Sequence, residues 1–207
     1  MGIFKTFVET QLRKTRREHV EDLLVLMDQR GYYTARCGRH HRYEGGTLQH
    51  SIEVLLYALE HITHGIPEDS IVVACLLHDL CNVQGFRHIS RHGSRSVRLA
   101  THVAGFLLSH DEYQAILWHM HGWSEKGTLG DDFDATTHCK LWQLLRDADK
   151  HSAGHPMRRT DIAARLQELL REEYDAGWIN KNRLSGRFFV VLHGFCKDKI
   201  NPTLTIH

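Results

Sequence analysis

The stretch "SIVVACLLHDL", residues 70–80, constrains the fold more than any other part of the chain. Every residue from Ile71 to Leu77 is apolar, so a helix built from this stretch has no polar face and must be covered on all sides. The stretch nevertheless ends in His78 and Asp79, and a buried aspartate is costly unless it is paired or binds a cation. A His-Asp pair hydrogen-bonded to loop backbone and a metal site both meet that requirement.

Apolar residues at helical spacing recur along most of the chain, which has only three prolines. Pro67 suits a first helical position, and Ser109 with Glu112 forms a capping box. We expect helices over residues 4–29, 47–64, 67–80, 93–108, 111–120, 138–153 and 160–174. We expect a loop over the Gly/Asp-rich residues 122–136, and the alternation within 186–207 is compatible with a small β-hairpin. The sequence therefore predicts an all-α bundle of about seven helices with a possible C-terminal hairpin.

Composition excludes several classes of protein. The net charge of +1 gives no general attraction to nucleic acid or to an anionic membrane, although four arginines between residues 87 and 98 form a local basic cluster. The five cysteines include no C-x-x-C pair, which argues against a zinc ribbon or a disulfide framework. We see no signal peptide and no apolar run of transmembrane length. We therefore expect a cytoplasmic protein with no membrane partner, of undefined oligomeric state.

Histidine is unusually abundant, with 18 residues, and histidine is the commonest metal ligand. His50 lies among apolar residues near the start of the second expected helix. Asp149 lies on or near the buried face of helix 138–153, while Asp147 is roughly 200° away around the same helix, so only one of the two can share that face. Together with His78 and Asp79, three helices thus offer polar donors from apolar surfaces, which is how helical bundles build metal sites.

His50, the adjacent His78-Asp79 and Asp149 resemble the H…HD…D signature of the HD-domain superfamily of metal-dependent phosphohydrolases. The words "HHRYEGGTLQHS" and "AILWHMHGW" are similar to those of HD domains in bacterial 3′→5′ exoribonucleases, and similar openings occur in HD-type relaxases of conjugative elements. The resemblance implies a single HD domain over residues 1–207. Its parts would be an N-terminal helix over 1–30, an HD core over about 36–155, and a C-terminal helix and possible hairpin over 156–207.

The resemblance also implies the ligands of one or two divalent metal ions. The first ion would be held by His50, His78, Asp79 and Asp149. The second would be held by His92 and His119, with Asp79 as the natural bridging ligand because a carboxylate has two oxygens. His92 could instead be an exposed residue at a helix start, whereas His119 shares a face with Ala115 and Ile116. A set of nitrogen and oxygen donors without thiolate admits Mn, Fe, Co, Ni, Zn or Mg.

Three more histidines lie close to the signature in sequence. His40 and His41 are expected in a solvated loop, although either could contact a substrate. His121 is expected at the surface or in contact with a ligand residue.

We expect the metal site, with Asp79 and His78 at its centre, to catalyse phosphoester hydrolysis. A cation there would lower the pKa of a bound water and polarise a phosphoryl oxygen. Lys150, Arg91 and Arg95 could bind the phosphate of a nucleotide or short nucleic-acid end, although single cationic residues are usually solvated surface charges.

One departure from many relatives could change this function. Asn82 stands where they carry a lysine, which removes a phosphate contact. A catalytically silent module that binds a nucleotide or a partner, and a nucleic-acid-processing module of a mobile element, therefore remain alternatives.

Overall fold

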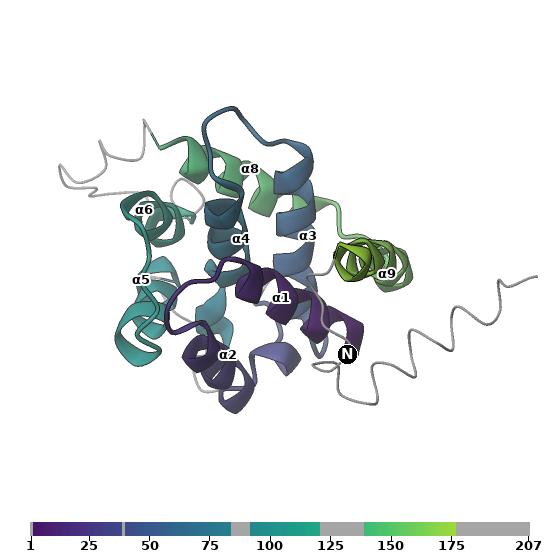
Figure 1. Ribbon diagram of the computed structural model, residues 1–207, viewed down its shortest axis with the longest axis horizontal. Helices are drawn as coiled ribbons and strands as arrows, with labels where there is room; N and C mark the ends of the chain where they lie inside the picture. The colour runs from purple at the N-terminus through teal and green to yellow at the C-terminus, as the bar shows by residue number, and fades with distance from the viewer. Residues whose placement is uncertain (1, 39, 84–91, 121–138, 177–207) are drawn as a thin grey trace, which may run out of the picture.

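The computed structural model describes residues 2–38, 40–83, 92–120 and 139–176, and all regular elements among them are helices packed into a bundle (Figure 1). The α-helices are α1 (Gly2–Lys14), α2 (Val20–Gln29), α3 (Gly46–Glu60), α4 (Glu68–Leu77), α5 (His92–Arg98), α6 (His110–Trp118), α8 (Lys140–Gly154) and α9 (Arg159–Asp175). Short 3-10 turns span Tyr32–Thr34 and Leu80–Asn82, and a π-helical turn spans Leu99–Val103. The all-α prediction is confirmed. The predicted loop over 122–136 and hairpin within 186–207 lie outside the described residues.

Helix α4 is the central element of the bundle, in contact with α1, α3, α6 and α8. All of its residues from Ser70 to Leu77 are buried, as the absence of a polar face required. Pro67 precedes the first turn, where Glu68 and Asp69 favour the positive end of the helix dipole. Each fully buried aliphatic side chain contributes roughly 1.5–3 kcal/mol. Burial of α4 therefore fixes the position of His78, which caps its C-terminal end.

The prediction of one helix over residues 4–29 is wrong, because a turn separates α1 from α2. Arg16 and His19 in this turn have φ angles of 52° and 60°, in the left-handed region that a helix cannot continue through. The turn directs Arg17 toward α6, where its guanidinium donates two hydrogen bonds of 2.6 Å each to Glu112. Glu112 is fully buried, so the broken helix supplies the charged partner that this carboxylate requires.

The helix predicted over 93–108 is also shorter than expected. Helix α5 ends at Arg98 and continues as the π-helical turn to Val103. Gly105, just beyond it, has a φ of 71°, the left-handed conformation that commonly ends a helix. The predicted capping box of Ser109 and Glu112 is present at the start of α6. A Cβ atom on Gly93 would lie 2.2 Å from the carbonyl oxygen of Leu117, so α5 and α6 approach backbone to backbone. This approach places α5 beside the end of α6.

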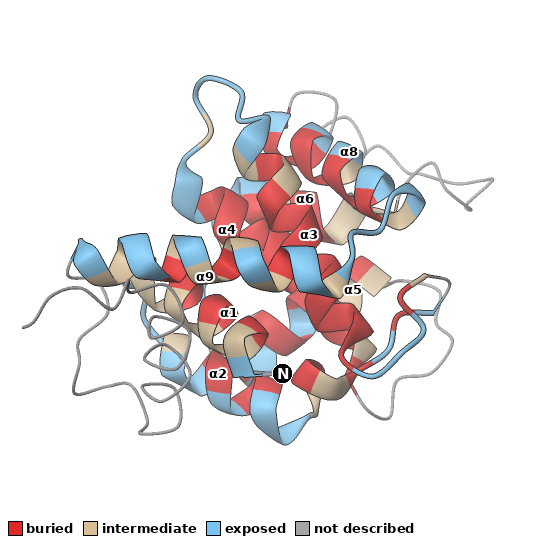
Figure 2. Ribbon diagram, turned by 90° about the vertical axis from the view of Figure 1, so that its right-hand side faces the viewer, coloured by how far each residue is buried: buried red, intermediate tan, exposed pale blue. Residues whose placement is uncertain are grey.

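Helices α3 and α8 pack side by side through their buried faces, which Figure 2 shows in red. Helix α3 ends at Glu60, slightly before the predicted His64. The helices predicted over 138–153 and 160–174 are confirmed as α8 and α9. No helix in the described ranges has the length and apolar character needed to cross a lipid bilayer.

Candidate metal centre

Three helices bring histidine and aspartate side chains to one buried point. His50 comes from α3, His78 and Asp79 follow α4, and Asp149 comes from α8. The Nε2 atom of His50 lies 3.0 Å from Oδ1 of Asp149 and 3.3 Å from Nε2 of His78. The His78 Nε2 atom also lies 3.9 Å from Oδ2 of Asp79 and 4.0 Å from Oδ1 of Asp149. The structure therefore brings together all four residues that the sequence placed at the first metal.

The proton on His78 is fixed by a backbone carbonyl. Its Nδ1 lies 2.9 Å from the carbonyl oxygen of Cys75, which can only accept, so Nδ1 carries the proton. The same holds for His119 at the end of α6, where Nδ1 donates to the carbonyl oxygen of Ile116 at 2.7 Å. In the neutral rings both Nε2 atoms are therefore unprotonated, and each carries a free lone pair. The Nε2 atom of His119 is buried without a hydrogen-bond partner and lies 3.8 Å from Oδ1 of Asp79.

The proton on His50 is fixed through a serine. The hydroxyl of Ser152 donates to Oε2 of Glu53 at 2.7 Å, so its oxygen must accept from Nδ1 of His50 at 2.9 Å. The Nε2 atom of His50 then also carries a free lone pair, although it faces a carboxylate oxygen of Asp149. Three imidazole lone pairs and two carboxylates thus converge. Their mutual repulsion is relieved only if protons are added or a cation binds between them.

Burial opposes protonation of the His78 ring. It lowers the pKa of His78 to about 4, so this ring is neutral near pH 7. The pKa values of both aspartates are lowered despite burial, which alone would raise them. The main opposing influence is the His78 imidazole at Asp79 and the His50 imidazole, 3.0 Å away, at Asp149. Burial lowers and the facing Asp79 carboxylate raises the pKa of His119, and the carboxylate prevails. The site therefore contains two negatively charged carboxylates and at least one imidazole that carries no compensating positive charge.

The donor atoms fit a divalent cation. Ligands about 2.1 Å from a common ion lie about 3.0 Å apart when adjacent at right angles and about 4.2 Å apart when opposite. Four of the six pairwise distances among His50, His78, Asp79 and Asp149 run from 3.0 to 4.0 Å, within that range. Imidazole nitrogens whose other nitrogen donates to a carbonyl or hydroxyl are the usual form of a histidine ligand. These four residues could hold one ion.

A family model described as "HD domain" matches residues 47–166, more than half of the 207 residues. The chain belongs to the HD-domain family. No curated protein and no solved structure matches it. HD domains bind divalent metals and are typical of metal-dependent phosphohydrolases. The division of residues 1–207 into parts, and the likeness to the exoribonuclease HD domains, remain predictions.

Asn82, at the position where the resemblance predicts a lysine, carries no charge. Its side-chain amide donates to Oδ2 of Asp79 at 2.9 Å and so orients the carboxylate. Lys150 is exposed on α8 beside Asp149, and Arg95 is partly buried on α5. Arg91 lies outside the described residues, as does His121.

The two candidate ligands of a second metal are placed differently. His119 is fully buried and faces Asp79. His92 is partly buried at the start of α5, where Nδ1 lies 3.5 Å from the sulfur of Cys81. The alternative of an exposed His92 is therefore wrong.

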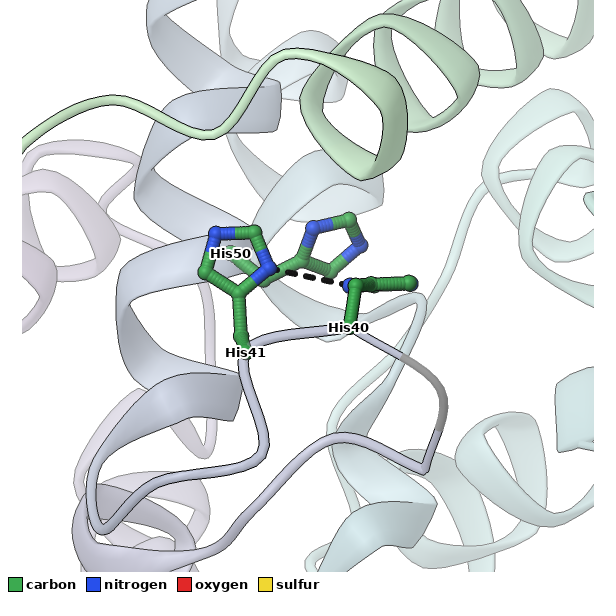
Figure 3. Close-up of side chains that lie close together, drawn as sticks. All are labelled: His40, His41 and His50. Atoms are coloured by element: carbon green, nitrogen blue, oxygen red, sulfur yellow. Dashed lines mark hydrogen bonds between the residues drawn. The ribbon is translucent and has the colours of Figure 1, made fainter.

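The prediction that both loop histidines are solvated is wrong for His41. Figure 3 shows the rings of His40, His41 and His50 lying close together. His41 is buried, and its Nε2 donates to Oε2 of Glu53 at 3.0 Å. Burial lowers the pKa of His40 to about 4, and its Nδ1 donates to Nδ1 of His41 at 3.0 Å. The ring of His40 lies 4.4 Å from that of His50, between centroids, so the loop forms one wall of the centre. Gly46 permits this, since a Cβ there would lie 1.8 Å from the His41 carbonyl oxygen.

Glu53 and Ser152 are functional residues that the sequence interpretation missed. Glu53 accepts from His41 and Ser152 through Oε2, and from Gln49 and the backbone of Met157 through Oε1. These hydrogen bonds keep its pKa low against the effect of burial. Glu53 follows His50 by three residues on α3, and Ser152 follows Asp149 by three on α8. That spacing puts each pair on one helix face and was the available signal.

Proposed function

We propose that this HD domain is a metal-dependent phosphohydrolase that cleaves a phosphoester of a nucleotide or of a short nucleic-acid end. The observation that carries the proposal is the set of imidazole nitrogens whose protons are directed away from the centre. His50 and His78 present lone pairs toward Asp79 and Asp149, and His119 presents another toward Asp79. In the neutral rings these nitrogens offer no proton to the two carboxylates, so a bound cation would balance the negative charge of the set.

The chain's own residues would hold and orient the reacting groups. His50, His78, Asp79 and Asp149 would bind the cation, and Asn82 would fix the rotamer of Asp79 through its amide. A divalent cation at such a centre acidifies a bound water molecule and polarises a phosphoryl oxygen. We propose that Lys150, Arg95 and Arg91 supply positive charge for the phosphate. Charge placed in this way stabilises a phosphoryl transition state by a few kcal/mol.

A second candidate function is a catalytically silent module that binds a nucleotide or a partner. The observation in its favour is Asn82, which carries no charge and is committed to Asp79. In such a module the metal would stabilise the fold, and the phosphate would lack the charge that a lysine supplies.

Hydrolysis assays on metal-loaded protein separate the two candidates. We expect metal-dependent release of phosphate or nucleoside from at least one of the mono-, di-, tri- and cyclic nucleotides and short oligonucleotides. Chelation should abolish it, and Mn or Co should restore it. Asp149→Ala should lose more than about 100-fold in rate, because loss of an outer partner alone costs 10- to 100-fold. Asp147→Ala, an exposed carboxylate two residues away on α8, should retain the rate.

Two results would count against the enzyme. Inactivity of fully metallated protein across that substrate panel would favour the binding module. Equal rates in Asp149→Ala and Asp147→Ala would show that the measured hydrolysis does not come from this centre.

A further inference from the structure

Cys81 places a thiol beside the carboxylate of Asp79. One ligand atom each from Asp79, Cys81 and His92 all lie within 4.8 Å of one another. Cys81 is buried, and the turn Leu80–Asn82 holds it in place, with its backbone N–H donating to Ser96 Oγ at 3.1 Å. This thiol faces His92 at the start of α5.

The spacing of sulfur and nitrogen is that of two ligands on one ion. The Cys81 sulfur and Nδ1 of His92 are 3.5 Å apart. Ligands at about 2.3 Å for sulfur and 2.0–2.1 Å for nitrogen lie about 3.5 Å apart around a tetrahedral zinc ion. A thiol hydrogen bond to the ring would give a similar distance, so a second observation has to decide between them.

That second observation is the unpartnered nitrogen of His119. Its Nε2 atom is fully buried, has no hydrogen-bond partner, and points to Oδ1 of Asp79 at 3.8 Å. The other oxygen of Asp79, Oδ2, accepts from Asn82 and lies on the side of His78. Asp79 belongs both to the group of Cys81 and His92 and to the group of His50 and His78. The His119 nitrogen faces Asp79 between the two groups, since it also lies within 4.8 Å of a donor atom each of His78 and Asp149.

We propose that Cys81 is a ligand of a second cation, together with Asp79, His92 and His119, and that it makes this position selective for a thiophilic ion such as Zn²⁺ over Mg²⁺. Thiolate is a soft ligand that favours zinc, whereas magnesium requires oxygen ligands. On binding, the sulfur–metal bond replaces the S–H bond, and the proton leaves to solvent. The expectation of a metal set without thiolate is thereby replaced. The inference deepens the proposed function, since it concerns the metal that the same centre would use.

The two charged or polar neighbours of the sulfur suit a thiolate. The Arg95 cation and the Ser96 hydroxyl each favour the ionised form of Cys81, although burial and the Asp79 carboxylate outweigh them in the metal-free protein and raise the pKa of the thiol to about 12.

Cobalt titration of the metal-free protein tests the proposal directly. Bound Co²⁺ has visible d–d bands at either position, but only a thiolate ligand adds a near-ultraviolet charge-transfer band. We expect the wild-type protein to show both. Cys81→Ser should lose the charge-transfer band, keep d–d bands from the first position, and bind its second Co²⁺ at least about tenfold more weakly. Cys139→Ser, which alters another buried thiol at the start of α8, should keep both bands.

The outcomes distinguish this proposal from the function it rests on. Cobalt bound with d–d bands but without a charge-transfer band would overturn the assignment of Cys81 and leave the first metal position intact. A charge-transfer band that survives in Cys81→Ser would overturn it equally. Hydrolysis is measured separately, so an inactive protein with a charge-transfer band would support the Cys81 site and contradict only the enzyme.

Discussion

Replacing Ser152 by alanine removes the group that fixes the proton of His50, while all proposed metal ligands stay unchanged. The hydroxyl accepts from Nδ1 of His50 and donates to Glu53, and it is buried. In the alanine variant the ring N–H has no acceptor, which costs about 1–3 kcal/mol, and a hydrogen bond to a charged carboxylate is lost as well. We expect the free energy of unfolding to fall by about 2–4 kcal/mol.

The effect on metal affinity is the more specific consequence. Without Ser152 the His50 ring is free to rotate or to move its proton to Nε2, where it would face the cation. Loss of such a partner typically weakens metal binding 10- to 100-fold, which is about 1.4–2.7 kcal/mol. Competition with a chromophoric chelator measures this constant. Thermal unfolding at a fixed metal concentration should show a correspondingly smaller stabilisation by metal.

Ser51→Ala is the matched control, because it removes a buried hydroxyl adjacent to His50 that does not contact the centre. Ser51 accepts from Tyr32, whose hydroxyl also lies within donating distance, at 2.9 Å, of the Leu76 carbonyl oxygen. We expect a loss of about 1 kcal/mol of stability and unchanged metal affinity. Wild-type metal affinity in Ser152→Ala, within about threefold, would refute the account of how His50 is oriented.

Two further perturbations follow from particular contacts. Gly46→Ala should destabilise the protein by more than about 2 kcal/mol and weaken metal binding, because its Cβ would lie 1.8 Å from the His41 carbonyl oxygen; Gly154→Ala, with open space around it, should be nearly neutral in chemical denaturation. Metal-free protein should lose stability as the pH falls from about 6.5 to 4, since the unfolded chain then binds a proton that native His78, with a pKa of about 4, does not. His78 contributes about 3 kcal/mol to this loss in the free energy of unfolding. Denaturant unfolding of wild type and His78→Gln at several pH values separates this contribution from the opposite one of His119. Equal pH slopes in the two proteins would contradict the role of His78.

The parts of the structure that sequence could predict are those written in local patterns. Residues 71–77 have no polar face, so burial of α4 follows from composition alone. Asp149 is buried and Asp147 exposed because only one can share the apolar face of α8. The capping box at Ser109 is likewise a pattern of four consecutive residues. Each of these needs no knowledge of a distant partner.

The parts that sequence missed depend on partners far along the chain. The turn between α1 and α2 is stabilised by Arg17 reaching Glu112, 95 residues away. Burial of His41 requires Glu53 on the next helix, which in turn binds Ser152, 99 residues away. A loop histidine and a helical glutamate each look like ordinary surface residues in sequence. Tertiary contacts decide these features, and no local pattern reports them.

Metal content is the measurement that tests the central claim most directly. Elemental analysis of the purified protein after reconstitution with excess divalent metal and removal of unbound ions should find at least one tightly bound cation per chain. Asp79→Ala, which removes a carboxylate facing both His78 and His119, should lose that cation and melt at a lower temperature than the metal-loaded wild type. Full occupancy in Asp79→Ala, or a wild-type protein that retains no cation, would contradict the assignment of a metal centre to these residues.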